Sequence, residues 1–395
     1  MKLFPLWLVF FFLFSVHSEC FAGDFGFLLN QKLLLSGGEE SSTEYTGSAI
    51  PWFSSPLGDR ADFYLSGGIS AHYDDEAWKP LPEIYRFEFI YNPSPDLRVE
   101  FGRLPFRESL SYVASGLFDG LAAGYNINGG RFSAGLFYTG LLYKKAAYIF
   151  MSPDDKNDLA DTDKYFASRR IIAALNWEKT SVFDTRSGLA LSGLCQFDLN
   201  DSGTTIHSQY LEAKFTLPLG AAFNTVSGVV IETAKESGRV FAAFALSLDV
   251  QWLPPGGVQD MVTFTGRFSS GDWNGRWGAF VPISAEAQGR VLRPVLSGIA
   301  LVEAFYTARL CRALAADVSA SYYFRTDTGT YDATGIGDSA SPLVGAEVYG
   351  GVSWSPYSDV LLSLGAGAFF PGTGRAFSDD SKIKYRVEMT AGISL

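Results

Sequence analysis

Charged residues recur at every second position in several stretches of this sequence. Three such pairs have the form Arg-x-Glu: Arg86 and Glu88, Arg98 and Glu100, and Arg386 and Glu388. Side chains two positions apart in a strand point to the same face of a sheet. Rows of mixed charge on a wet face can set the field that a passing ion meets. They can equally form ion pairs that stiffen a wall, and the sequence favours neither role over the other.

One short segment suggests hydrolysis. Residues 105–109, Pro-Phe-Arg-Glu-Ser, resemble a motif of outer-membrane phospholipases, in which Ser109 would be a nucleophile beside a histidine. The His-x-Ser-Asn pattern of that family is missing, and the histidines after residue 22 are His72 and His207. We therefore expect no enzymatic activity and no catalytic residue. The scarcity of histidine and cysteine also argues against a transition-metal site.

Five aspartates lie close together, at positions 154, 155, 158, 161 and 163. Carboxylate oxygens are suitable ligands for Ca²⁺, but this spacing matches no known calcium loop. A solvated acidic loop is the favoured interpretation, and we expect neither a bound metal nor a cofactor.

The elements that position the charged pairs are strands with one apolar face. In residues 240–252 every even-numbered side chain is apolar, whereas Ser247, Asp249 and Gln251 lie on the other parity. Residues 83–91 and 97–104 alternate in the same way on either side of a turn that contains Pro93 and Pro95. Each of these segments is therefore predicted to be a strand with an apolar face and a polar face.

This pattern recurs to the end of the chain and predicts eighteen strands, with sixteen as the alternative count. The predicted strands are residues 25–35, 43–53, 61–73, 83–91, 97–104, 117–127, 131–143, 170–177, 189–197, 207–217, 223–233, 240–252, 258–268, 297–308, 317–325, 344–354, 360–370 and 383–395. Short turns alternate with long loops, which is typical of outer-membrane barrels. The predicted fold is all-β, a transmembrane antiparallel up-and-down β-barrel. A secreted soluble β-protein is the alternative, although such sheets rarely keep one face apolar on so many strands.

The first 22 residues have the features of a secretory signal peptide. Lys2 precedes an apolar run at residues 6–14, and Cys20-Phe21-Ala22 offers a cleavage site. A lipoprotein attached through Cys20 is a weaker alternative. We expect export through the Sec pathway and residues 23–395 to form a single barrel domain in the outer membrane of a diderm bacterium.

Composition and the last strand indicate the partners. The net charge of −11 without a basic cluster argues against nucleic acid, and 15% aromatic residues suit strands in contact with outer-membrane lipid. Residues 385–395 resemble the C-terminal signal by which bacterial barrels engage the barrel-assembly machinery, although Leu395 replaces the usual terminal aromatic residue.

Two short motifs resemble a known family. Phe101-Gly102-Arg103 and Phe118-Asp119-Gly120 are similar to a pairing early in the alginate-export type of eighteen-stranded barrel, within the porin superfamily. The resemblance implies a channel, and it carries over no substrate-binding residue. The fatty-acid transporter barrels are a second relative, but their N-terminal plug has no counterpart before residue 25.

The side chains on the polar face of each strand should line the lumen, because a charge that faces lipid at mid-membrane costs about 2–4 kcal/mol. The predicted pore-lining residues are Arg86, Glu88, Arg98, Glu100, Arg170, Glu212, Lys214, Asp249, Arg267, Arg325, Arg386 and Glu388.

The loop at residues 269–291 is the predicted constriction. Loops longer than about a dozen residues are usually functional or disordered, and this one carries aromatic residues that disordered segments lack. Folded into the lumen, it would place Asp272, Trp273, Arg276 and Trp277 at the narrowest point. A surface loop that packs on its neighbours is an equally weighted alternative.

These observations favour a porin-like channel for passive diffusion of small hydrophilic solutes or ions. One alternative is a specific exporter of an anionic polymer, although the near-balanced charge of the predicted lumen does not select it. Another is a surface adhesin or structural barrel with a blocked lumen.

Overall fold

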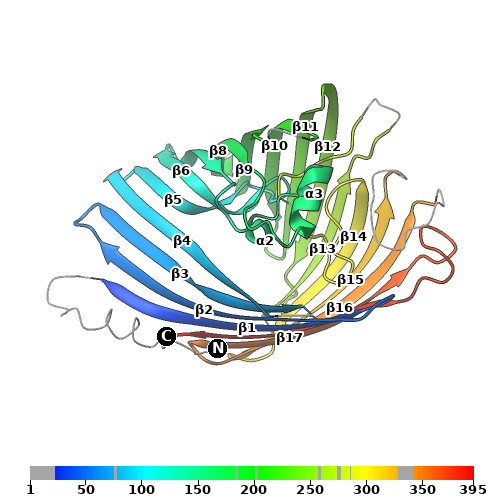
Figure 1. Ribbon diagram of the computed structural model, residues 1–395. Helices are drawn as coiled ribbons and strands as arrows, with labels where there is room; N and C mark the ends of the chain where they lie inside the picture. Colours follow the sequence, from blue (N-terminus) through cyan, green and yellow to red (C-terminus); the bar gives the residue numbers. More distant parts are fainter. Residues whose placement is uncertain are drawn as a thin grey trace.

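The strands form one closed antiparallel barrel (Figure 1). The computed structural model describes residues 23–74, 78–182, 186–200, 203–256, 259–273, 277–284, 286–327 and 341–395. The sheet has eighteen strands, and β1 (Asp24–Gly37) closes it by pairing with β18 (Lys384–Ser394). Because each strand thereby has two partners, the sheet has no open edge. The predicted fold class and strand count are confirmed, whereas the predicted signal peptide lies outside the described residues.

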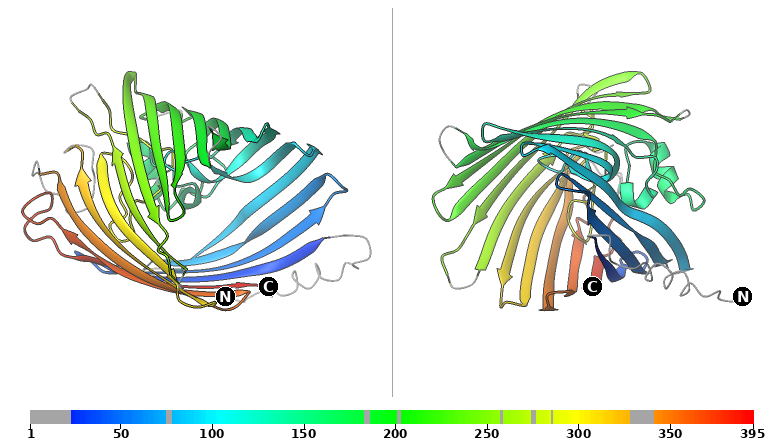
Figure 2. Two further views of the ribbon diagram at one scale, coloured as in Figure 1. Left: turned by 180° about the vertical axis from the view of Figure 1, so that it is seen from behind. Right: turned by 90° about the vertical axis from the view of Figure 1, so that its left-hand side faces the viewer.

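The other strands follow one another around the barrel (Figure 2). They are β2 (Ser42–Pro56), β3 (Ala61–Asp74), β4 (Trp78–Ser94), β5 (Leu97–Arg107), β6 (Ser115–Ile127), β7 (Gly130–Tyr138), β8 (Arg170–Val182), β9 (Ser187–Asp198), β10 (Ile206–Leu219), β11 (Phe223–Glu236), β12 (Arg239–Trp252), β13 (Gln259–Ser269), β14 (Ile299–Arg309), β15 (Leu314–Arg325), β16 (Leu343–Tyr357) and β17 (Val360–Pro371). Since consecutive strands are antiparallel, their connections alternate between the two rims. The long connections β7–β8 (139–169) and β13–β14 (270–298) are at the same rim.

The β7–β8 connection differs from its prediction in two ways. The strand predicted at residues 131–143 ends at Tyr138, where the Thr139 hydroxyl turns to accept a hydrogen bond from the Arg170 N–H at 3.0 Å. The predicted acidic loop contains the helix α3 (Pro153–Ala160), preceded by the short helix α2 (Lys144–Ala147). Ser152 and Asp155 form a capping box at the start of α3. Within the described residues, no helix is long and apolar enough to cross a bilayer.

The apolar face of each strand points outward. In β12, Val240, Leu246 and Leu248 are 64, 43 and 50% exposed, whereas Ala243 and Ala245 on the other parity are fully buried. Outward aromatic rings gather towards both rims. They include the pair Phe223–Trp252 at the short-turn rim and the cluster Phe244, Phe268, Trp273 and Trp277 at the long-loop rim. An apolar band between aromatic girdles is typical of a membrane-spanning barrel.

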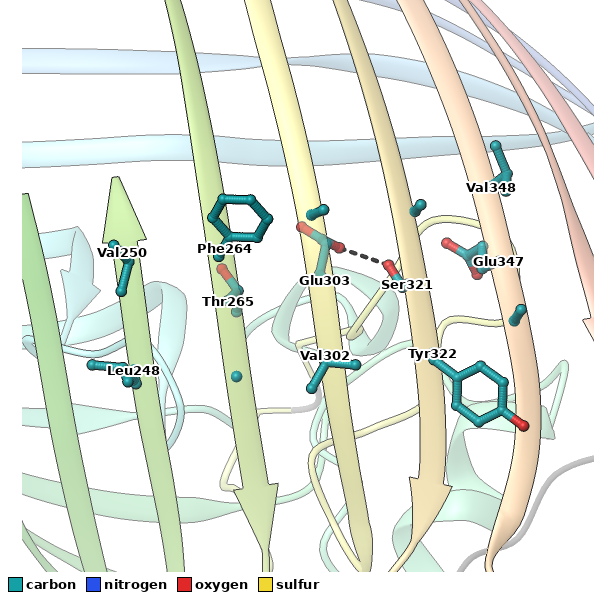
Figure 3. A pocket seen from close by; sticks show the side chains of 14 residues that line it. Leu248, Val250, Phe264, Thr265, Val302, Glu303, Ser321, Tyr322, Glu347 and Val348 are labelled. Atoms are coloured by element: carbon teal, nitrogen blue, oxygen red, sulfur yellow. Dashed lines mark hydrogen bonds between the residues drawn. The ribbon is translucent and has the colours of Figure 1, made fainter. Parts of the chain in front are cut away.

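Shallow hollows on this outer face lie where small outward residues adjoin large ones. One spans β12 to β16 and is lined by Leu248, Phe264, Val302, Tyr322 and Val348, with small residues such as Ala304 and Ala320 between them (Figure 3). Glu303, on the opposite parity to Val302, accepts a hydrogen bond from Ser321 at 3.0 Å. The hollow therefore belongs to the apolar band and not to the lumen.

A β-bulge in β4 changes the face of one predicted outward residue. The β3–β4 register shifts so that Ser66 opposes Arg86 while Gly67 opposes Ile84, which leaves Tyr85 as the extra residue. Ile84 is 54% exposed, whereas Tyr85 is half-buried. The sequence placed Tyr85 on the apolar face because strict alternation cannot show a bulge.

The outward register of β12 gives the first testable expectation. Leu246→Arg should impair membrane assembly, because an arginine in the apolar band costs about 2–4 kcal/mol. The matched control is Gln251→Arg, since Gln251 has the inward parity and is half-buried near the short-turn rim. The heat-modifiable migration of the folded barrel measures both variants. Equal assembly of the two would contradict this register.

Candidate functional site

The lumen is not empty, because three connections from the long-loop rim fold into it. They are the β5–β6 loop (108–114), the β7–β8 loop (139–169) and the β13–β14 loop (270–298). Their buried apolar residues join inward side chains of the wall in one cluster; those from the loops include Tyr112, Val113, Ile149, Phe280 and Ile283. The hydrophobic core of the protein therefore lies inside the barrel.

The β5–β6 loop crosses to the wall opposite its own strands. The Leu110 N–H donates to Glu212 on β10 at 2.9 Å, and Lys214 donates to the Ser109 carbonyl at 2.9 Å. At its tip, the Tyr112 ring lies 5.5 Å from the Arg267 guanidinium on β13. This short loop thus divides the lumen.

Glu108 holds the shape of the β5–β6 loop. Its carboxylate is almost completely buried and accepts hydrogen bonds from the N–H groups of Tyr112, Val113 and Ala114. Burial raises the pKa of the Glu108 carboxyl, and the three N–H donors oppose that rise only in part.

The β13–β14 loop is attached to the wall by carboxylates on two strands. Glu232 on β11 accepts the Val281 N–H at 2.8 Å. Glu347 on β16 accepts the N–H groups of Arg290 at 2.7 Å and Leu292 at 2.8 Å. These hydrogen bonds place the loop across the lumen between β11 and β16.

The three loops meet at Ser284. The Ser284 hydroxyl accepts the Ser115 N–H at 2.8 Å and donates to the Ser115 carbonyl at 3.1 Å. The Ile283 N–H donates to the Val113 carbonyl at 2.7 Å, and Ser284 forms a β-bridge with Ile149 of the β7–β8 loop. Each loop therefore supports the other two.

These loops cover only part of the inner wall. Inward side chains are largely buried on β8 to β16, whereas from β18 through β1 to β5 several long inward side chains reach solvent between buried residues such as Ile50 and Ser66. There the side chains of Lys32, Arg86 and Arg98 remain 45, 41 and 45% exposed. The water-accessible path therefore runs off-centre, along the bare wall from β18 to β5.

The predicted pore-lining residues all have the inward parity but fall into two groups. The first group lies on the bare wall, where it forms ion pairs at 2.5 to 2.9 Å: Arg86 with Glu88, Arg98 with Glu100, and Arg386 with Glu388. Lys32 extends the last pair, 3.0 Å from Glu388. The side chains of Lys32, Arg86 and Arg98 meet water, whereas those of Glu88 and Arg386 are only 6 and 11% exposed.

The second group is covered by the loops or by neighbouring side chains. It contains Arg170, Glu212, Lys214, Asp249, Arg267 and Arg325. Arg170 is fully buried, 2.7 Å from Asp155 of α3 and 3.3 Å from Asp198. Arg325 donates to the Ser341 carbonyl at 2.8 Å, and Asp249 accepts from Thr265 at 2.7 Å. Arg170, Glu212, Lys214 and Arg267 hold loops in place.

The residues predicted for the narrowest point lie at the rim instead. Trp273 and Trp277 pack on Phe244, whose parity is outward, at ring distances of 6.0 and 5.2 Å. Asp272 is exposed, 3.5 Å from Arg239, and Arg276 lies outside the described residues. Among the described residues of this loop, those that enter the lumen are 280–284 and 286–292.

Sequence reasoning missed two cations that reach solvent inside the barrel, Arg290 and Lys32. The Arg290 guanidinium lies 2.9 Å from Asp317 on β15 and 4.9 Å from the Tyr349 ring centre on β16. Arg290 sits in a loop without periodicity, so no pattern marks it. Lys32 has inward parity, but the apolar run Leu33-Leu34-Leu35 hides the alternation around it.

Groups considered for catalysis or metal binding lie apart. The Ser109 hydroxyl is 3.2 Å from that of Ser192, whereas His72 contacts Thr46 and His207 contacts the Asp198 N–H. In the described parts of the chain, no three histidine, cysteine, aspartate or glutamate residues are arranged to hold a metal ion.

Solved structures similar to this barrel include proteins of Pseudomonas aeruginosa, among them the outer membrane protein OpdK. OpdK with vanillate has a TM-score of 0.66 at 11% identity, over 95% of this chain and 98% of that one. OccK2 (OpdF) in complex with glucuronate has a TM-score of 0.65 at 13% identity, over 95% of this chain and 97% of that one. OccK5 (OpdH) has a TM-score of 0.63 at 11% identity, over 94% of this chain and 98% of that one. No protein-family model and no curated sequence matches the chain. At these identities the likeness shows the fold.

Proposed function

We propose that this protein is an outer-membrane channel for passive diffusion of small hydrophilic solutes. The observation that carries the proposal is the bare, charged inner wall from β18 to β5, beside a lumen otherwise filled by folded loops. A structural barrel could use these ion pairs to stiffen its wall, but with a blocked lumen it would not leave Lys32, Arg86 and Arg98 in contact with water. Single-channel recording in planar bilayers tests the proposal, which requires stable conductance steps from the purified protein.

Two features support small solutes over a polymer. The loops narrow the lumen, and the path presents carboxylates beside each cation, as in the pairs of Arg98 with Glu100 and Arg386 with Glu388. An exporter of an anionic polymer, as in the alginate-export type, would need a wider and more uniformly basic path. The vanillate and glucuronate bound in OpdK and OccK2 are small, and they make solutes of that size reasonable first probes.

We propose, as part of the same function, that the protein is located in the outer membrane. The aromatic girdles and apolar band suit lipid contact, and β18 provides the closing strand that assembly would engage. Export by the signal peptide at residues 1–22 is part of the same expectation.

Neutralising the cations of the bare wall should shift ion preference. The variant Lys32→Gln, Arg86→Gln, Arg98→Gln and Arg386→Gln removes positive charge from the bare wall while Glu88, Glu100 and Glu388 remain, so the path should become more selective for cations. Reversal potentials in a salt gradient measure the change. The control is Arg309→Gln with Arg312→Gln, at an exposed turn, and this variant should behave like the parent. An unshifted reversal potential in the fourfold variant would remove these side chains from the conduction path.

A further inference from the structure

Two aromatic side chains lie side by side on the bare wall. Trp52 on β2 and Tyr64 on β3 stack with ring centres 6.2 Å apart and an interplanar angle of 17°. Trp52 has the inward parity, because the neighbouring Phe53 joins the row of outward rings that reaches Phe101, which is 55% exposed. The pair therefore faces the lumen, in the half of β2 and β3 nearer the short-turn rim.

The backbone leaves room for this arrangement. A Cβ atom at Gly26 of β1 would lie 2.4 Å from the Trp52 ring, so a larger residue at position 26 would displace the indole. On the other side of the pair, the Arg86 guanidinium lies 4.8 Å from the Tyr64 ring centre, and Glu88 binds it through two oxygens. Trp52, Tyr64 and Arg86 form a continuous surface across β2, β3 and β4, which we call the aromatic platform.

The aromatic platform has unused hydrogen-bond donors. Among the described residues, none accepts a hydrogen bond from Trp52 Nε1, the Tyr64 hydroxyl or Arg86 Nη1, whereas the other guanidinium nitrogens of Arg86 bind Glu88. None of these three atoms is a buried unsatisfied group. They are therefore open to lumen water and to a ligand that could replace it.

Flat aromatic faces beside polar donors suit one class of solute in particular. A pyranose sugar has an apolar face of C–H groups that packs on an aromatic ring, and an edge of hydroxyls that accept and donate hydrogen bonds. An open-chain polyol offers the same hydroxyls without a rigid apolar face. A simple ion uses the charge of Arg86 but gains nothing from the indole.

We propose that Trp52, Tyr64 and Arg86 form a binding subsite for the ring of a pyranose sugar within the channel. The sugar ring stacks on Trp52, which Tyr64 supports from the side, and its hydroxyls replace water at the free donors of the aromatic platform. The subsite rests on the proposed function in that a solute reaches it through the channel, but binding to it does not require ion conduction.

Saturation-transfer NMR on the detergent-solubilised barrel tests the subsite directly. The probes are methyl glucoside, whose ring is locked, and sorbitol, an open chain of similar size. Methyl glucoside should bind at least about fivefold more tightly than sorbitol, which is the scale of one favourable aromatic contact. Trp52→Leu should abolish that preference, and Tyr64→Leu should reduce it.

The control is Trp354→Leu, because Trp354 lies on the outer face and is 49% exposed. It should leave the preference unchanged. Equal binding of the two probes to the parent, or an unaltered preference in a folded Trp52→Leu variant, would overturn the proposal. If Trp52→Leu does not assemble, Tyr64→Leu decides in the same way. Ion conductance of the parent without sugar is measured separately, so a closed barrel that binds methyl glucoside would refute the proposed function alone.

Discussion

Removing residues 279–292 and joining the ends with a short Gly-Ser linker should raise single-channel conductance by about twofold or more, since eighteen strands leave an aqueous interior unless loops fill it. This segment holds Phe280 and Ile283, which are fully buried in the lumen, and Arg290, whose side chain is 41% exposed beside Asp317 on β15. Its removal also frees Glu232 and Glu347 to meet water in place of loop N–H groups.

The control for this deletion uses the outer part of the same loop. Trp277→Ala removes a ring that packs on Phe244 at the rim, so it should leave conductance unchanged. Planar-bilayer recordings of the parent, the deletion and the control make the comparison. If the deletion variant assembles and conducts like the parent, the inner part of the β13–β14 loop does not limit the path.

Replacing Arg170 should have the largest effect on stability. Its side chain is fully buried and neutralises Asp155 of α3 and Asp198 of β9, so Arg170→Met leaves two buried carboxylates without their cation. Breaking a buried ion pair in this way costs about 3–5 kcal/mol. We expect α3 to detach from the wall, which protease cleavage within residues 150–165 should reveal before the barrel itself unfolds.

A variant that also removes both carboxylate charges separates the effect of unpaired buried charge from the effect of lost packing. In Arg170→Met combined with Asp155→Asn and Asp198→Asn, no buried charge is left unpaired, so much of the loss should be recovered. Asp155 also accepts the Met151 and Ser152 N–H groups, which an asparagine oxygen can still do. Protection of α3 in Arg170→Met equal to that in the parent would show that this ion pair does not anchor the helix.

The sequence alone predicted the barrel because the pattern that indicates transmembrane strands is periodic. An apolar residue at every second position needs a lipid-facing surface, and this requirement repeats in each strand independently of the others. Eighteen strands, the outward register of β12 and the inward parity of Arg86 and Arg386 therefore followed from the chain alone. The register failed at Tyr85, since a bulge inserts a residue without leaving a mark in the pattern.

Only the tertiary structure decided what the inward charges do. Arg86 and Arg170 are both charged residues on the inward face of a strand. Arg86 nevertheless faces water, whereas Arg170 lies under α3. The difference depends on which loops fold into the lumen and which wall they reach. Loop paths are set by single contacts between distant segments, such as Glu232 with the Val281 N–H, and not by a repeat. No pattern in the amino-acid sequence marks such contacts, so the off-centre path can be identified only in the folded barrel.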